Sequence, residues 1–173
     1  MTSRRSYFQT AWVVNDLEQA VHEWVNRVQI GPFFLLPHSR IDNSVYHGSP
    51  VTVDISIAVA QVGPMQIELI EQHGRQSSPF TVELPQAGAH HHIAAMTDDL
   101  DEDIRYYANQ GIVAVFTGLV GDARFAFINT RSSLGFLTEL IQRGSSVEGL
   151  FEFVSQAGAE WDGSDPIRSL PSN

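Results

Sequence analysis

Apolar side chains recur along this chain in two patterns, one typical of helices and one typical of strands. Between residues 17 and 28 they return every three or four positions, at Leu17, Val21, Trp24 and Val28. The same spacing returns between residues 100 and 107, so both segments are predicted to be amphipathic helices. An apolar, strand-like run and a short turn precede each helix. Each turn holds Asn or Asp side chains, at residues 15–16 and 98–99, that can cap the helix amides.

The two segments belong to a longer internal repeat. Residues 9–24 align without a gap over residues 92–107, matching Ala11 with Ala94, Asp16 with Asp99 and Leu17 with Leu100. Three strand-like runs follow each helix, at residues 33–36, 51–61 and 65–71 in the first half and 113–117, 124–129 and 136–142 in the second. Both halves close on the tripeptide Glu-Leu-Ile. One strand–turn–helix match arises readily by chance, but a second match in the same order favours a duplication.

The repeat predicts the domain organisation and the fold class. The first module spans residues 5–73 and the second spans residues 85–143, each read as one strand, one helix and three strands. This order gives an α+β protein with two tandem βαβββ modules, whose curved mixed sheet would surround a trough. The linker covers residues 74–88. The loop at residues 37–50 is predicted to be irregular, because Gly, Ser and Pro occur in it.

The composition excludes several kinds of chemistry. The chain has no Cys and no Lys, so disulfides, thiolate ligands, a Cys nucleophile, Schiff-base chemistry and a P-loop lysine are ruled out. With a formal net charge of −10 and scattered Arg residues, nucleic acid is not an expected partner. No run approaches the roughly 18 apolar residues that a membrane span needs, and no secretory signal is visible. We therefore expect a cytoplasmic protein with no membrane partner.

Four metal-capable side chains occupy two pairs of equivalent positions in the repeat. Gln9 and His92 open the first strand of each module, and Glu68 and Glu139 lie in the last strand. A strongly curved sheet would bring these positions together in one trough. An amide, an imidazole and two carboxylates suit one divalent ion with open positions for water or substrate, and Zn²⁺, Ni²⁺, Co²⁺, Mn²⁺ and Mg²⁺ are the candidates.

Each of these residues also has a simpler interpretation. The triplet His90 to His92 could be a polar loop, and we interpret His90 and His91 in that way, whereas His92 alone occupies the repeat-equivalent position. Glu68 and Glu139 could face solvent by strand alternation. A carboxylate turned inward, however, needs a partner to offset its desolvation, and a metal is a natural one. Gln9 is selected as a ligand only because His92, its equivalent in the repeat, is selected as one.

The sequence around His92 is similar to the opening of a known family's module. Residues 91–94 (HHIA), followed by residues 98–100 (DDL), resemble the vicinal oxygen chelate superfamily, which includes glyoxalase I, methylmalonyl-CoA epimerase, extradiol dioxygenases and bleomycin-resistance proteins. The resemblance covers roughly residues 7–142 and implies βαβββ modules with metal ligands on their first and fourth strands. The set it implies is Gln9, Glu68, His92 and Glu139, which is similar to that of glyoxalase I.

The same resemblance implies a metal-dependent isomerase, epimerase or lyase that works through a metal-stabilised enolate. Glu139 and Glu68 are candidates for the base, since one ligand carboxylate could loosen and take the proton. The epimerases place a catalytic Glu in the third strand of module one, where this chain has Thr52. Asp54 lies two residues along on the same face and is the third candidate base. Gln9 in place of a His argues against a ring-cleaving iron dioxygenase.

The expected partner is a small-molecule substrate. An anionic carrier such as CoA or glutathione would need Arg at the mouth of the trough, and the candidates are Arg40, Arg75, Arg124 and Arg143. A neutral aromatic or terpenoid-like substrate fits equally well, with Phe33, Phe34, Phe125, Phe127 and Phe136 as candidates for its pocket, although Phe in strands is more often core. We take Arg124 and Phe127 as the predicted substrate contacts. The alternative function is a non-catalytic binding protein of the bleomycin-resistance type.

Residues 145–173 lie outside the repeat. Val147, Leu150, Phe151 and Val154 have helical spacing, so this tail is predicted to form a helix that covers part of a sheet or a partner subunit. A turn-rich segment follows from Trp161. Because such tails occur in related sequences of the superfamily, a homodimer is expected.

Overall fold

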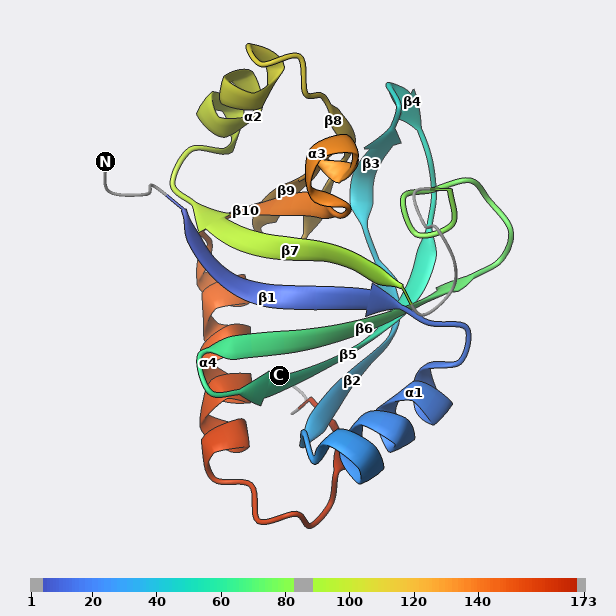
Figure 1. Ribbon diagram of the computed structural model, residues 1–173, viewed down its shortest axis with the longest axis vertical. Coiled ribbons are helices and arrows are strands. Elements are labelled where there is room, and N and C mark those ends of the chain that lie inside the picture. Colours follow the sequence, from blue (N-terminus) through green and yellow to red (C-terminus); the bar gives the residue numbers. More distant parts are fainter. Residues whose placement is uncertain (1–4, 83–88, 171–173) are drawn as a thin grey trace.

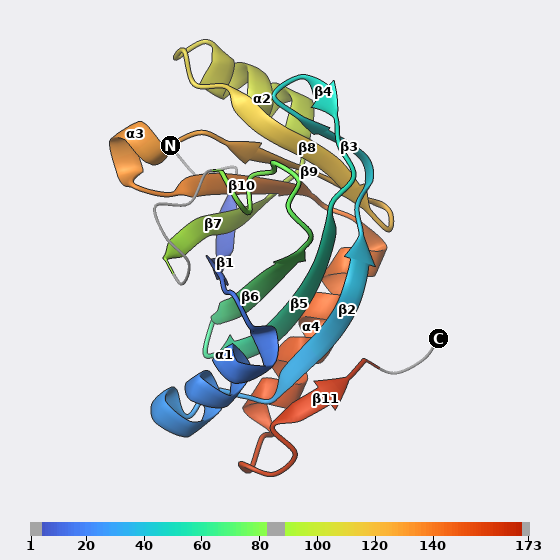
Figure 2. The same ribbon diagram turned by 90° about the vertical axis from the view of Figure 1, so that its right-hand side faces the viewer.

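Two strands at the centre of the sheet join the two halves of the chain. In this computed structural model, which describes residues 5–82 and 89–170, eleven strands form one mixed sheet in the order β11-β2-β5-β6-β1-β7-β10-β9-β8-β3-β4 (Figure 1). β1 (Ser6–Val13) runs antiparallel to β7 (His90–Thr97) in the middle of that order. The predicted α+β class and curved mixed sheet are thereby confirmed, and Figure 2 shows the curvature.

In both halves a helix follows the first strand, and further strands follow that helix. The first half holds α1 (Leu17–Glu23), which continues into the π-helix η1 (Trp24–Val28), and then β2 (Phe33–Arg40), β3 (Asp42–Tyr46), β4 (Ser49–Pro50), β5 (Asp54–Val62) and β6 (Met65–His73). The second half holds α2 (Leu100–Ala108), β8 (Ala114–Val120), β9 (Ala123–Ile128), α3 (Arg131–Leu134) and β10 (Leu137–Gln142). The tail forms α4 (Ser145–Ala159) and β11 (Ile167–Ser169).

The strand register of one half repeats in the other. β1 pairs in parallel with β6, which sets Ala11 opposite Glu68, and β7 pairs in parallel with β10, which sets Ala94 opposite Glu139. The two carboxylates therefore occupy equivalent places beside the central pair of strands. Because β1 and β7 adjoin, these places lie close together across the middle of the sheet.

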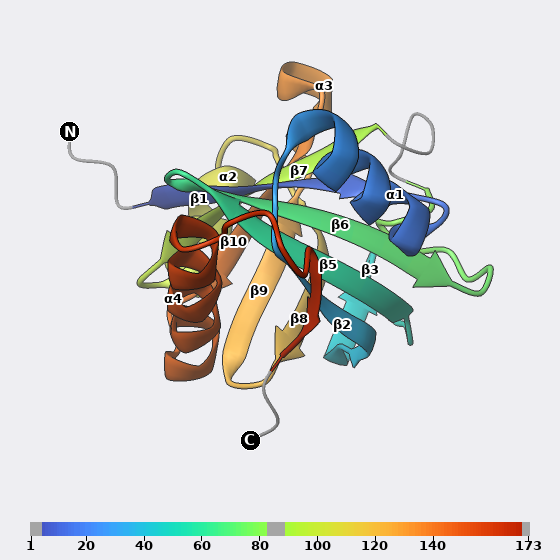
Figure 3. The ribbon, with the colours of Figure 1, turned by 90° about the horizontal axis from the view of Figure 1, so that it is seen from below.

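The sheet has two differently covered faces. We call the concave side the inner face; it carries Ile55, Ile57 and Phe127, and it holds the largest cluster of buried apolar residues together with the cavity described below. The outer face is covered by α1 over the first half and by α2 over the second. Figure 3 shows α1 and α4 on opposite faces of the first half. Alternation along each strand thus decides which residues reach the inner face.

The helices begin and pack as the sequence pattern predicts. The side chains of Asp16 and Asp99 accept hydrogen bonds of 2.8 Å from the backbone amides of Gln19 and Glu102, which makes these two Asp residues the N-caps. α4 packs on the sheet of the same chain, where Val154 is fully buried against Phe34 and Val59. The homodimer remains a prediction.

Three features of the chain differ from the expectation or fall outside the described residues. The predicted irregular loop at 37–50 is wrong, since its residues extend β2 and form β3 and β4, and β3 crosses to pair with β8 of the other half. β11 pairs in parallel with β2 and was not predicted. The end of the linker and the start of the second module, residues 83–88, lie outside the described residues, as do residues 171–173 of the tail. In the part that is described, no helix is long and apolar enough to cross a membrane.

Candidate metal centre

Three of the predicted ligands meet on the inner face. His92 Nε2 lies 3.1 Å from Glu139 Oε2 and 3.3 Å from Glu68 Oε2, and the three ligand atoms all lie within 4.8 Å of one another. These residues come from β7, β10 and β6, so three strands of two halves supply them. The side chain of His92 is only 1% exposed, and those of Glu68 and Glu139 are 13% and 11% exposed. Such burial of two carboxylates requires a compensating charge.

A bulge in β7 sets the direction of His92. Along the β1–β7 pair, Trp12 faces His90 and Ala11 faces His92, so His91 is an extra residue on the β7 side. The bulge lets His91 and His92 turn toward each other, and both rings contact Phe127. Bulges commonly re-aim a side chain next to a functional site.

His91 fixes the tautomer of His92. His91 Nε2 lies 3.1 Å from the carbonyl oxygen of Pro79, and only an N–H can bond to a carbonyl, so His91 carries its proton there. Burial, followed by the nearby charge of His92, holds the pKa of His91 well below its usual range, which keeps the ring neutral. Its Nδ1 therefore accepts the hydrogen bond of 2.8 Å from His92 Nδ1. His92 Nε2 is left as the atom that faces the two carboxylates.

Gln9 contributes an amide at the same place. Its Nε2 donates a hydrogen bond of 2.8 Å to Gln66 Oε1, and both side chains are buried. Gln9 lines the same cavity as Glu68 and Glu139. Gln66 thus orients the amide and leaves Gln9 Oε1 available as a ligand.

The donor set fits a divalent cation. Within residues 5–82 and 89–170, Gln9 Oε1 is buried without a hydrogen-bond partner, and the buried His92 Nε2 faces the two carboxylates; both are atoms that ligate metals. Burial by itself lowers the pKa of His92, but the negative charges of Glu139 and Glu68 outweigh it and raise the pKa to about 9. Burial also raises the pKa of Glu139. The site stabilises positive charge between its two carboxylates, and a divalent ion supplies more of that charge than one proton does.

These pKa shifts predict how the stability of chelator-treated protein depends on pH. A histidine whose pKa is raised on folding stabilises the folded state fully below its unfolded pKa of 6.5, and that stabilisation is lost as the pH rises through about 9. The raised pKa of Glu139 acts in the same direction. We expect the free energy of unfolding to fall between pH 6.5 and 9.5 by at most roughly 3 kcal/mol. Denaturant titrations in the presence of a chelator would measure it, with His92→Gln as control; an equal fall in the variant would contradict the assignment.

An apolar cavity adjoins the candidate ligands. It measures about 130 Å³, and Gln9, Glu68 and Glu139 line it together with side chains of β2, β5, β9 and α4. The apolar wall includes Ile55, Ile57, Val59, Phe125, Phe127 and Phe151. A buried polar group of ligands beside an apolar pocket is the usual form of a small-molecule site.

Two predicted site residues do not lie there. Asp54 is on the outer face of β5, since its neighbours Ile55 and Ile57 line the cavity, and it contacts His38 instead. Arg124 is on the outer face of β9 and forms an ion pair of 2.7 Å with Asp101. The predictions of Asp54 as a base and of Arg124 as a substrate contact are corrected accordingly. Phe127 does line the cavity.

The sequence analysis also missed two residues of the site. The interpretation of His90 and His91 as polar loop is wrong, because both lie in β7, and His91 is 2% exposed. Gln66 was not considered, although it lies two residues before Glu68 and therefore on the same face. That spacing was the available signal for Gln66; nothing in the sequence pattern marks the bulge that turns His91 inward.

The role of His91 can be tested directly. Replacing His91 with Phe removes the acceptor for His92 Nδ1–H, so the imidazole loses its fixed orientation; we expect a drop of about 10- to 100-fold in metal affinity. Titration calorimetry with Zn²⁺ measures the change. His22→Gln is the control, because His22 is an exposed histidine on α1. Equal affinities in both variants would show that His91 only fills space.

Comparison with known proteins gives one family and several similar folds. Residues 8–127 match the family described as glyoxalase/bleomycin resistance protein/dioxygenase superfamily. Among solved structures, the fold is similar to a hypothetical protein from Bacillus halodurans C-125, with 19% identity, a TM-score of 0.57 and coverage of 83% of this chain and 97% of that one. Methylmalonyl-CoA epimerase from Mycobacterium tuberculosis has 19% identity and a TM-score of 0.57, covering 86% and 95%.

A third similar structure is a Streptomyces coelicolor methylmalonyl-CoA epimerase in complex with 2-nitronate-propionyl-CoA, with 19% identity, a TM-score of 0.51 and coverage of 80% and 97%. A search among curated proteins found no match. At these identities the solved structures establish likeness of fold, whereas the family match covers more than half of the sequence. The chain belongs to the glyoxalase/bleomycin resistance protein/dioxygenase superfamily.

Proposed function

We propose that this protein is a metal-dependent enzyme that moves a proton beside the carbonyl group of a small, uncharged and mostly apolar substrate. Isomerisation, epimerisation or elimination would each follow from that step. The observation that carries the proposal is the buried group of Glu68, His92 and Glu139 beside an apolar cavity. Superfamily membership supports it.

Gln9, Glu68, His92 and Glu139 would hold one divalent ion, with Zn²⁺, Ni²⁺, Co²⁺, Mn²⁺ and Mg²⁺ as candidates. When bound, such an ion supplies Lewis-acid chemistry that stabilises negative charge as it develops on a substrate oxygen. His92 is held for this by His91, and the amide of Gln9 by Gln66. The apolar walls keep water from the reacting atoms.

Glu139 is the stronger candidate for the base. Its carboxylate is almost fully buried beside the cavity, and burial raises its pKa. A raised pKa suits a group that must both accept and return a proton near neutral pH. Glu68 lines the same cavity from the other half of the chain and is the second candidate.

The walls of the cavity support an uncharged substrate. Among the lining residues that the structure describes, no side chain is basic, and the acidic ones are the two ligands. Arg40, Arg124 and Arg143 form exposed ion pairs with Asp42, with Asp101, and with Asp98 and Glu148. A carboxylate on the substrate would therefore meet no guanidinium inside. An engineered cavity of similar size, about 150 Å³, accommodates benzene, which sets the scale of the buried part.

A proton-exchange assay tests the proposed function. Protein loaded in turn with each candidate ion is incubated in D₂O with small cyclic and aryl ketones, and loss of the proton beside the carbonyl is followed by NMR. We expect exchange with wild-type protein and at least a 100-fold slower rate with Glu139→Gln. Exchange that does not depend on Glu139, or that occurs only with carboxylate-bearing substrates, would contradict the proposal.

The apolar cavity also favours a second candidate, a non-catalytic protein that sequesters an apolar molecule. Elemental analysis separates the two functions. A stoichiometric metal after metal-supplemented growth supports the enzyme, and tight binding of apolar compounds by protein that retains no metal supports the binding protein.

A further inference from the structure

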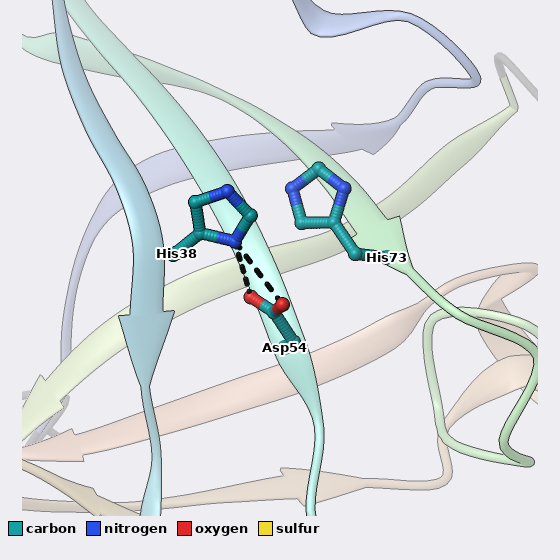
Figure 4. A group of neighbouring side chains, drawn as sticks. All are labelled: His38, Asp54 and His73. Atoms are coloured by element: carbon teal, nitrogen blue, oxygen red, sulfur yellow. Dashed lines mark hydrogen bonds and ion pairs between the residues drawn. The ribbon is translucent and has the colours of Figure 1, made fainter.

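A second group of metal-capable side chains lies on the opposite face of the sheet from the cavity. It consists of His38 from β2, Asp54 from β5 and His73 from β6 (Figure 4). The strands β2, β5 and β6 are neighbours in the sheet. Because Ile55 on β5 faces the cavity, Asp54 faces outward, so this group does not share the cavity.

A bulge in β2 turns His38 over β5. Leu36 faces Ile57 and Ser39 faces Ile55, so β2 has one residue more than β5 in this stretch. His38 has a left-handed backbone conformation with φ of 48°, and its amide donates a hydrogen bond of 3.1 Å to Ser56 Oγ. Its ring Nδ1 then lies 3.0 Å and 3.1 Å from the two carboxylate oxygens of Asp54. A non-glycine residue in this backbone region is uncommon, and here it accompanies the extra residue of the bulge.

His73 completes the group from the other side. It lies directly opposite Asp54 in the β5–β6 register, and its Nε2 lies 2.7 Å from Ser56 Oγ. The rings of His38 and His73 are 4.6 Å apart and inclined by 34°. One ligand atom from each of His38, Asp54 and His73 lies within 4.8 Å of the others. Small side-chain rotations would bring all three onto one ion.

Two imidazoles and one carboxylate form a typical donor set for a transition-metal ion. Imidazole nitrogen suits Zn²⁺, Ni²⁺ and Cu²⁺, and a third ligand from Asp leaves positions for water. The side chains are 69%, 48% and 31% exposed for His38, Asp54 and His73, so solvent can supply those waters. The net charge of −10 further favours a bound cation.

We propose that His38, Asp54 and His73 bind a second divalent metal ion, with Zn²⁺ as the preferred one, on the outer face of the sheet. The ion would link β2, β5 and β6 and hold the β2 bulge in place. This site is independent of the proposed function, since none of its residues lines the cavity.

Zinc titration of the full chain tests the second site. Calorimetry with Zn²⁺ alone is expected to show two sites in the wild type. His38→Asn and Asp54→Asn should each weaken one site at least tenfold and leave the other unchanged, whereas His92→Gln should remove the other. His22→Gln is the matched control, because His22 is an exposed histidine on α1 outside both groups.

Histidine NMR spectra give a readout that does not depend on the fold of the variants. Addition of Zn²⁺ to the wild-type protein should shift the ring signals of both His38 and His73. A single zinc site that disappears in His92→Gln, with the His38 and His73 signals unmoved, would overturn the proposal. Unchanged zinc affinity at both sites in His38→Asn and Asp54→Asn would overturn it as well.

Discussion

Replacing Glu139 with Ala is expected to abolish turnover and to lower the metal affinity of the cavity site by more than about 100-fold. That loss exceeds the 10- to 100-fold typical of residues that only support a ligand. The reason is that Glu139 Oε2 lies 3.1 Å from His92 Nε2 and supplies one of the two buried negative charges of the site. Metal affinity is measured by competition with a chelator, and turnover by the proton-exchange assay.

Glu139→Gln and Glu152→Ala make this experiment selective. Glu139→Gln keeps the volume of the side chain, so it separates loss of charge from creation of a cavity. Glu152 is an exposed glutamate on α4 and should tolerate Ala with no change in metal affinity. If Glu139→Ala retains full turnover with its metal bound, neither the ligand role nor the base role of Glu139 can stand.

The internal repeat explains why the candidate ligands could be selected from the sequence. Equivalent residues of two duplicated halves occupy equivalent places in a sheet, so identical strand registers brought Glu68 and Glu139 beside the β1–β7 pair. His92 could be selected in the same way, because it is the repeat equivalent of Gln9. The curved mixed sheet could be predicted for the same reason, since a strand, a helix and further strands follow one another in both halves.

The face of a strand was harder to predict than its position. Asp54 lies on a strand whose two sets of alternating residues, polar and apolar, could each have faced either the trough or solvent. The apolar set, with Ile55 and Ile57, lines the cavity, which leaves Asp54 on the outer face. Arg124 was misassigned for the same reason, since its neighbours Ala123 and Phe125 take the inner face.

Bulges and distant strand pairings could not be read from a local pattern. The extra residue at His91 depends on how β7 aligns with β1, about 80 residues away along the chain. Likewise, β3 forms a strand because the edge of β8 is available to it, and β11 because the edge of β2 is. Each of these pairings is tertiary, and strand propensity is correspondingly dependent on context.

Replacing Phe127 with Ala is expected to reduce the free energy of unfolding by about 3–5 kcal/mol, the usual cost of removing a buried aromatic side chain. Phe127 is 2% exposed and its ring packs against Phe80, Phe116 and Phe125 as well as both histidines of the bulge. Phe127 lines the cavity, so its removal would enlarge that cavity rather than leave a small gap that neighbouring side chains can fill. Denaturant titration measures the change, and Phe153→Ala, at a side chain 38% exposed on α4, should cost much less.

A comparison of Phe127→Ala with Phe127→Leu separates the packing role of this side chain from its contact with substrate. Because the ring of Phe127 lies 4.9 Å from that of His92, its removal should also loosen the imidazole and weaken metal binding. Phe127→Leu keeps most of the apolar volume, so it should recover most of the stability and metal affinity while changing which apolar substrates are accepted. A Leu variant that is as unstable as the Ala variant would show that the aromatic contacts, rather than the filled volume, hold the histidine pair in place.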